Sequence, residues 1–153
     1  MPVAWRIVKT RRAKSPFDGE GARLFGGRWT SPGRAVVYTA DSAALATLEI
    51  LVHLGSGPAL AEYSLVSVTI PSADVATVDV AKLPDDWRSY PAPAALREIG
   101  DQWFDAGKTA VLRVPSAVVP AEFNYLIDPK HPRFKGCKIG KPTRYAWDRR
   151  LGR

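Results

Sequence analysis

Three polar residues that could act together in chemistry lie within one short stretch, residues 26–57. Arg28 follows two glycines in the segment GGRWTSPG, Tyr38 lies in the run VVYTA, and Glu49 lies in the apolar run AALATLEILVHL. A carboxylate in an apolar helix is costly unless it is paired or solvated in a cleft. Glu49 is therefore the first candidate for a functional residue.

The local pattern predicts the element that carries Glu49. Asp41 and Ser42 are both residue types that cap helices, and residues 44–54 place apolar side chains nearly all round a helical wheel. Such a helix is expected to be buried. Glu49 borders its most apolar face, and His53, one turn further, is expected to be mostly structural or to pair with Glu49.

The rest of the chain indicates a sheet with few helices. Proline- and glycine-containing polar segments, residues 9–20 and 83–93, are expected to be loops, and the first of them to be mobile. Because strands outnumber helices and do not alternate with them, the pattern predicts one α+β domain with a mixed sheet. The predicted strands are residues 3–8, 35–40, 62–70 and 109–114, with 75–80 a strand or connector. Residues 118–127 are predicted to bend at Pro120 and then form a strand, and a second helix is predicted for 94–106.

The charge of the chain is concentrated at one end. The net charge is +7, and residues 130–153 hold nine Lys or Arg against one acidic residue, which leaves −1 for residues 1–129. This basic segment suits nucleic acid or an acidic partner protein. No apolar run is long enough to span a membrane and no signal peptide is evident, so a cytoplasmic protein is expected. One cysteine and two histidines argue against a structural metal site.

Four segments together resemble the RES domain, a family named for its Arg, Glu and Ser. They are GGRW-x-SPG, VVYTA, ALATLEILVHL and VPSAVVPAEFNYLIDP, in that order. The resemblance runs from about Trp5 to Pro129 and makes residues 1–153 a single RES domain with a basic C-terminal segment, 130–153. It implies a fold like that of ADP-ribosyltransferase toxins. It also implies a toxin that consumes NAD⁺ without a metal, and an Xre-type helix-turn-helix antitoxin as its partner.

Carried over by motif, the functional positions are Arg28, Tyr38, Glu49 and Ser116, with Asn124 a weaker addition. Cleavage of the nicotinamide–ribose bond builds positive charge on the sugar, as in glycoside hydrolysis, and the Glu49 carboxylate would stabilise that charge. Arg28 would hold the pyrophosphate and Tyr38 would position the nicotinamide end. Ser116, and more weakly Asn124, would bind substrate. The acceptor of the ADP-ribosyl group stays open between water, phosphate and protein.

Other interpretations stay open at this point. Without the motif, Arg28 suits a surface arginine, Tyr38 a core tyrosine and Ser116 a turn residue. A second class of function is a metal-free ribonuclease or RNA-binding toxin that uses the basic segment with its aromatic residues. A third is a pure partner-binding module. In the favoured interpretation, that of a RES-type toxin, the chain contacts nucleic acid only through its antitoxin.

Overall fold

The strands pair into one mixed sheet in the computed structural model, which describes residues 1–54 and 62–152. Within the described residues the sheet has the order β4-β5-β6-β2-β1-β3-β7, and β8 also pairs with β3. β4 runs parallel to β5, and the other pairs are antiparallel. The predicted α+β class is confirmed. The strands are β1 (Val3–Lys9), β2 (Val37–Ala40), β3 (Tyr63–Thr69), β4 (Val75–Thr77), β5 (Val111–Pro115), β6 (Phe123–Ile127), β7 (Lys138–Ile139) and β8 (Thr143–Tyr145).

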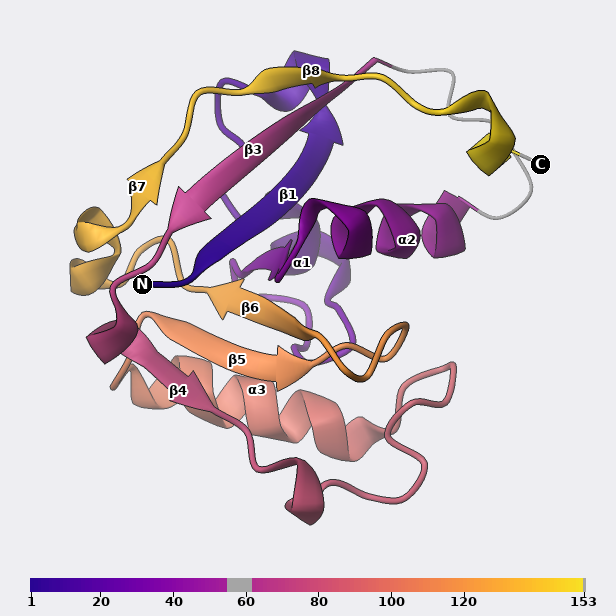
Figure 1. The fold of residues 1–153 in the computed structure, drawn as a ribbon. Helices are drawn as coiled ribbons and strands as arrows, with labels where there is room; N and C mark the ends of the chain where they lie inside the picture. Colours follow the sequence, from indigo (N-terminus) through magenta and orange to yellow (C-terminus); the bar gives the residue numbers. More distant parts are fainter. Residues whose placement is uncertain (55–61, 153) are drawn as a thin grey trace.

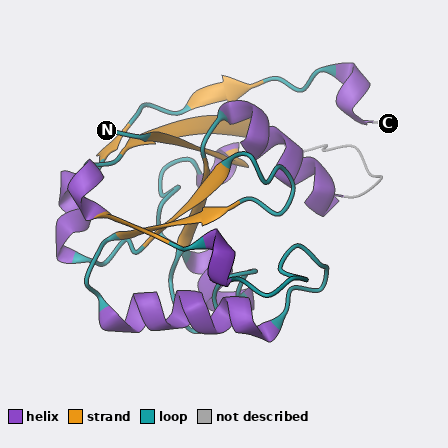
Figure 2. Ribbon diagram, turned by 60° about the horizontal axis from the view of Figure 1, so that its bottom comes forward, coloured by secondary structure: helices purple, strands orange, loops and turns teal. Residues whose placement is uncertain are grey.

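The sheet curves between two groups of strands, with helices at different places around it (Figure 1). β1 and β3 cross the upper half of this view, and β4, β5 and β6 cross the lower half with α3 (Ala94–Ala106) beneath them. Figure 2 shows the strands as one twisted layer above that helix. The remaining α-helices are α1 (Glu20–Phe25) and α2 (Ala43–Leu54).

The predicted apolar stripe of α3 is confirmed by its packing. Leu96 is fully buried against β5 and β6, and Ile99, Trp103 and Phe104 pack on the same cluster. The helix ends before Gly107, whose left-handed backbone (φ 62°) is a common helix stop. No helix in residues 1–54 or 62–152 has the length and apolar character needed to cross a membrane.

The expectation that the Glu49 helix is buried all round is wrong. Leu45, Ala46 and Thr47 of α2 are buried, but Leu48 is 41% exposed and Val52 is 66% exposed. The helix packs on β1 and β2 through one face only. Its other apolar side chains therefore remain at the surface.

The sequence pattern missed α1, β7 and β8, which are short. β7 and β8 have two and three residues, and their pairing with β3 defines them more than any alternation of side chains. The segment predicted as a mobile loop, residues 9–20, contains a turn of 3-10 helix and buries Phe17 in the core. β6 begins at Phe123, after a loop of residues 118–122, which agrees with the bend predicted around Pro120.

Gly100 lets α3 lie directly against the chain before β2. A Cβ on Gly100 would lie 1.7 Å from the Trp29 carbonyl oxygen. We expect Gly100→Ala to lower the free energy of unfolding by about 1–3 kcal/mol, because the backbones must move apart. Gly21→Ala in α1 is the matched control, because its Cβ would meet nothing within 4 Å. Urea unfolding measures both, and equal stabilities would contradict the close approach.

Candidate active site

Glu49 stands on a helix whose first turn is fixed. The Ser42 hydroxyl oxygen accepts a hydrogen bond from the Leu45 amide at 3.0 Å, so Ser42 caps α2. The same hydroxyl donates to Glu122 Oε1 at 2.7 Å. Because Glu122 directly precedes β6, this bond fixes the start of α2 relative to the sheet.

Both carboxylate oxygens of Glu49 accept hydrogen bonds from the sheet. Ser116 Oγ donates to Glu49 Oε2 at 3.0 Å, and Asn124 Nδ2 donates to Oε1 at 2.8 Å. Glu49 is half-buried, and this burial raises the pKa of its carboxyl group, although the two hydrogen bonds act in the opposite direction. Glu122 adds a smaller repulsion that also raises the pKa. The site thus orients a carboxylate whose charge it only partly compensates.

The two donors to Glu49 are themselves held by backbone groups. Ser116 Oγ accepts from the Val118 and Val119 amides, both at 3.1 Å, which leaves its own proton for Glu49. Asn124 Nδ2 also donates to the Thr39 carbonyl at 3.1 Å. Ser116 is fully buried, which favours a role in positioning Glu49 over the direct substrate contact predicted from the sequence. Asn124 reaches the cavity surface.

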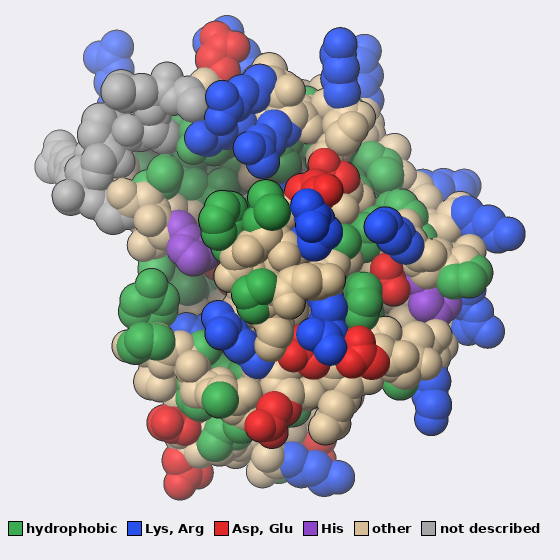
Figure 3. Space-filling model, turned by 180° about the vertical axis from the view of Figure 1, so that it is seen from behind, with side chains coloured by type: hydrophobic (Ala, Val, Ile, Leu, Met, Phe, Trp, Pro, Cys, Tyr) green, Lys and Arg blue, Asp and Glu red, His purple; other side chains and the backbone are tan. Residues whose placement is uncertain are grey.

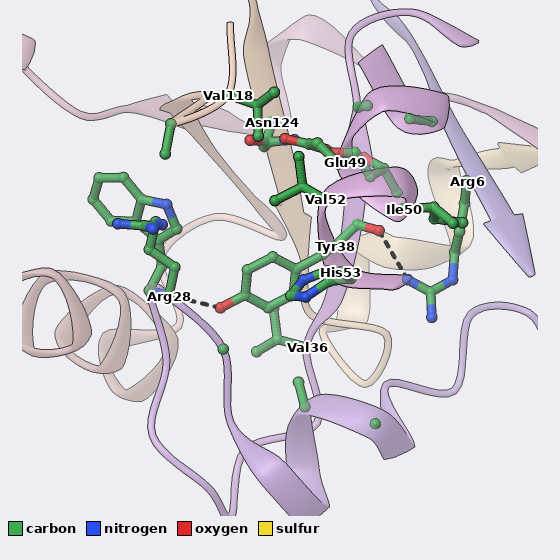
Figure 4. A pocket seen from close by; sticks show the side chains of 18 of the residues that line it. Arg6, Arg28, Val36, Tyr38, Glu49, Ile50, Val52, His53, Val118 and Asn124 are labelled. Atoms are coloured by element: carbon green, nitrogen blue, oxygen red, sulfur yellow. Dashed lines mark hydrogen bonds between the residues drawn. The ribbon is translucent and has the colours of Figure 1, made fainter. Parts of the chain in front are cut away.

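A cavity of about 860 Å³ opens beside Glu49, a volume suited to a small-molecule ligand. Figure 4 shows Tyr38 in the middle of this space, with Glu49 and Asn124 together on one side. Arg28 and Arg6 lie at opposite sides of Tyr38. Among the described residues, the titratable side chains other than tyrosine that line the cavity are three arginines, one carboxylate and one histidine: Arg6, Arg28, Arg97, Glu49 and His53. The excess of fixed positive charge suits an anionic ligand.

The loop that carries Arg28 wraps round the Tyr38 side chain. Tyr38 Oη accepts a hydrogen bond from the Trp29 amide at 3.1 Å and lies 2.8 Å from Thr30 Oγ1. Gly27 permits this contact, because a Cβ there would lie 2.5 Å from the Tyr38 hydroxyl. Gly26 has a φ of 71°, which favours glycine. These interactions explain why two glycines precede Arg28.

Arg28 joins this loop to the segment that follows Leu83. Its Nη1 donates to the carbonyls of Trp87 at 3.0 Å and Ser89 at 2.9 Å. Its Nε and Nη2 make no hydrogen bond with residues 1–54 or 62–152. Burial lowers the pKa of the Arg28 guanidinium from its ordinary value, and Tyr38 and Tyr90 have smaller effects that raise it. Arg28 therefore anchors one wall of the cavity and still presents donors to it.

Arg6 is a site residue that the sequence analysis missed. It lies on β1, where Nη1 donates to the Tyr38 carbonyl at 2.8 Å, while its buried Nε has no partner in the described part of the chain. Burial lowers the pKa of this guanidinium, with a smaller opposing effect of Asp18. Arg6 is a charged residue inside the apolar strand WRIV, and the criterion that singled out Glu49 could have identified it from the sequence. Its Nη2 makes no hydrogen bond with the described residues, and an anion in the cavity would supply a partner for it.

His53 does not pair with Glu49 in the described structure. It is exposed and lines the cavity, whereas the Glu49 hydrogen bonds go to Ser116 and Asn124. Within residues 1–54 and 62–152, no group of three His, Cys, Asp or Glu side chains could hold a metal ion. The described part of the cavity combines an oriented carboxylate with arginines in its lining.

Comparison with known proteins agrees with the resemblance drawn from the sequence. Residues 3–148 match the family model described as RES domain. The chain belongs to the RES domain family. Two curated relatives share its length. One is "Toxin Res" of Yersinia enterocolitica, 38% identical over 150 residues, which cover 97% of this chain and 99% of that protein. The other is "Prs ADP-ribosylating toxin" of a Sphingobium species, 42% identical over 152 residues, which cover 96% and 94%.

A solved structure confirms the fold of this RES chain. It is the crystal structure of the M. tuberculosis MbcT-MbcA toxin-antitoxin complex, which matches with a TM-score of 0.75 over 95% of this chain and 84% of that chain. At 18% identity, the likeness concerns the fold.

Glu49→Gln is expected to stabilise the protein at mildly alkaline pH. The pKa of Glu49 is raised in the folded protein. The charged side chain therefore destabilises the folded state as the pH rises above the ordinary pKa of a glutamate, and it has no such effect at lower pH. Glutamine has the same size and no charge to desolvate. Thermal unfolding should therefore show a higher midpoint for Glu49→Gln than for the native protein at alkaline pH, with a smaller difference at acidic pH.

Glu98→Gln is the matched control, because Glu98 is an exposed carboxylate on α3. It should leave the midpoint nearly unchanged at both pH values. A native protein that is more stable than Glu49→Gln at alkaline pH would show that the hydrogen bonds outweigh the burial of the charge.

Proposed function

We propose that this RES chain is the toxin of a toxin–antitoxin pair and consumes NAD⁺ by cleaving its nicotinamide–ribose bond. The observation that carries the proposal is the Glu49 carboxylate, held through both oxygens at the edge of an arginine-lined cavity. The names of the curated relatives, toxins of the same length with one called ADP-ribosylating, support it. The reaction is that of an NAD⁺ glycohydrolase, phosphorylase or ADP-ribosyltransferase.

Glu49 would act on the sugar of NAD⁺. Departure of nicotinamide leaves positive charge on the ribose, and a fixed carboxylate beside it lowers the energy of that state. The hydrogen bonds from Ser116 and Asn124 hold the carboxylate in place before the substrate arrives. Since the group is half-buried, its field is less screened than it would be in water. Glu49 must be ionised for this role.

The arginines would bind the pyrophosphate. A guanidinium can donate two parallel hydrogen bonds to phosphate oxygens, and Arg28 and Arg6 both have donors without partners among the described residues. The Tyr38 ring between them faces the cavity and suits the cationic nicotinamide ring. We propose Arg28, Tyr38 and Glu49 as the catalytic set. Asn124 is proposed as a substrate contact, and Ser116 as the residue that orients Glu49.

The alternative of a ribonuclease or RNA-binding toxin has less support. Its argument depends on the aromatic residues of the basic segment as stacking surfaces for bases. Tyr145 and Trp147 instead pack together with Tyr63 in the structure, and Phe134 packs on another part of the core. The exposed charges of the segment suit a partner protein, which we propose is an Xre-type helix-turn-helix antitoxin.

The test of the proposed reaction is NAD⁺ loss by the purified chain. Glu49→Gln should reduce turnover by roughly 100-fold or more, because it removes the charge that stabilises the sugar cation. Glu98→Gln should keep native turnover. Parallel incubation with RNA tests the alternative. Full activity of a folded Glu49→Gln protein, or RNA cleavage with intact NAD⁺, would refute the proposed mechanism.

A second prediction concerns the basic segment, residues 130–153. Figure 3 shows Lys and Arg side chains projecting from many points on the rim of one face. Lys135, Lys138 and Lys141 are exposed and form no ion pair within residues 1–54 and 62–152. We expect the triple change of these residues to Glu to weaken antitoxin binding and to keep NAD⁺ turnover. The loss should shrink as salt rises, because exposed charges are screened within about 10 Å at 0.1 M.

Isothermal titration with the antitoxin at two salt concentrations measures the effect. Arg144 is left unchanged, because it lies in β8 beside Tyr145. Unchanged affinity with abolished turnover would assign these lysines to the active site instead.

A further inference from the structure

The last strand brings a second set of contacts to the helix that carries Glu49. β8 pairs with the edge of β3, with Tyr145 opposite Tyr63 and Arg144 opposite Ser64. Figure 1 shows the chain leaving β8 toward the side of the molecule where α2 lies. We call residues 143–147 the C-terminal strap.

A short chain of hydrogen bonds joins this strap to α2. The hydroxyl oxygens of Tyr145 and Thr47 are 2.6 Å apart. Thr47 Oγ1 donates its proton to the Ala43 carbonyl at 2.8 Å, so the Tyr145 hydroxyl must be the donor to Thr47. Thr47 is 7% exposed, which means that the bond is shielded from water.

Aromatic packing fixes the Tyr145 ring in this position. Its ring meets Trp147 edge to face with centroids 5.0 Å apart, and Trp147 meets Tyr63 in the same way at 5.6 Å. These rings belong to the cluster that buries Leu45 and Ala46 of α2. The hydroxyl of Tyr145 is thus presented to the helix by a rigid group.

Thr47 and Glu49 lie on opposite sides of α2. Two residues correspond to about 200° on a helix of 3.6 residues per turn. Thr47 faces the strap, and Glu49 faces Ser116 and Asn124. The helix is therefore held between the strap and the two donors of the site.

We propose that Tyr145 is a positioning residue for Glu49: its hydroxyl holds α2 at the distance at which the Glu49 carboxylate meets Ser116 and Asn124. The kinetic test of this proposal rests on the proposed function, because it measures NAD⁺ turnover. The arginines of the cavity lie on other elements, β1, the loop before β2 and α3. Loss of the Tyr145 hydroxyl should therefore affect the placement of Glu49 and leave NAD⁺ binding intact.

Tyr145→Phe tests the proposal, because it keeps the ring and removes only the hydroxyl. We expect kcat for NAD⁺ to fall roughly tenfold and KM to stay unchanged. The loss should be smaller than the ~100-fold loss of rate that misplacing a catalytic group by about 1 Å can cause. Thr47→Val should have the same effect, Thr47→Ser should keep near-native kcat, and the double variant should be no worse than either single one. Tyr63→Phe is the control, because its hydroxyl makes no hydrogen bond with any described residue of α2.

Hydrogen exchange of the α2 amides gives a second readout that does not depend on turnover. Tyr145→Phe should speed their exchange, and Tyr63→Phe should not. If the native chain leaves NAD⁺ intact, the proposed function fails and exchange alone decides whether the strap holds α2. An unchanged kcat in Tyr145→Phe would overturn the positioning role. A raised KM with a lower thermal stability, seen in Thr47→Ser as well, would also overturn it.

Discussion

The site depends on holding a half-buried carboxylate in a fixed position at the edge of a cavity. Burial alone would favour the protonated form of Glu49, and only two hydrogen bonds, from Ser116 and Asn124, oppose that effect. Ser116 is held by backbone amides of the loop that follows β5, and Asn124 by the Thr39 carbonyl of β2. The sheet therefore defines the position of the charge, and α2 delivers the side chain to it.

This constraint explains features of the fold that are distant in sequence. The start of α2 is fixed through Ser42 to Glu122, and its middle through Thr47 to Tyr145. The loop before β2 is fixed through Tyr38, and Arg28 connects it to Trp87 and Ser89, just before the cavity-lining residues 90–92. The cavity is thus built from segments between Trp5 and Asn124. The strap that reaches α2 is also part of the basic segment that we propose contacts the antitoxin.

Local sequence could identify the parts of the site that break a local rule. Glu49 was detectable because it interrupts an apolar helix, and the strands and α3 were detectable from their periodicity. Arg6 breaks the same rule on β1 and was overlooked. The exposure of Leu48 and Val52 could not be predicted, because it depends on which face of α2 meets the sheet. β7 and β8 are too short to have a pattern and exist through their pairing with β3. The family resemblance named Ser116 and Asn124 as site residues, but their pairing with Glu49 was not predicted, since hydrogen bonds between residues 67 and 75 positions apart leave no local signal.

We propose that Glu49 acts at the bond between nicotinamide and ribose. The decisive measurement is mass spectrometry of the products from NAD⁺ and the purified chain, with and without phosphate and with and without cell extract as a source of protein acceptors. We expect free nicotinamide together with ADP-ribose, a phosphorylated ADP-ribose or an ADP-ribosylated protein. Products split at the pyrophosphate, AMP with nicotinamide mononucleotide, would contradict the placement of Glu49 at the sugar, and unchanged NAD⁺ would contradict the reaction itself.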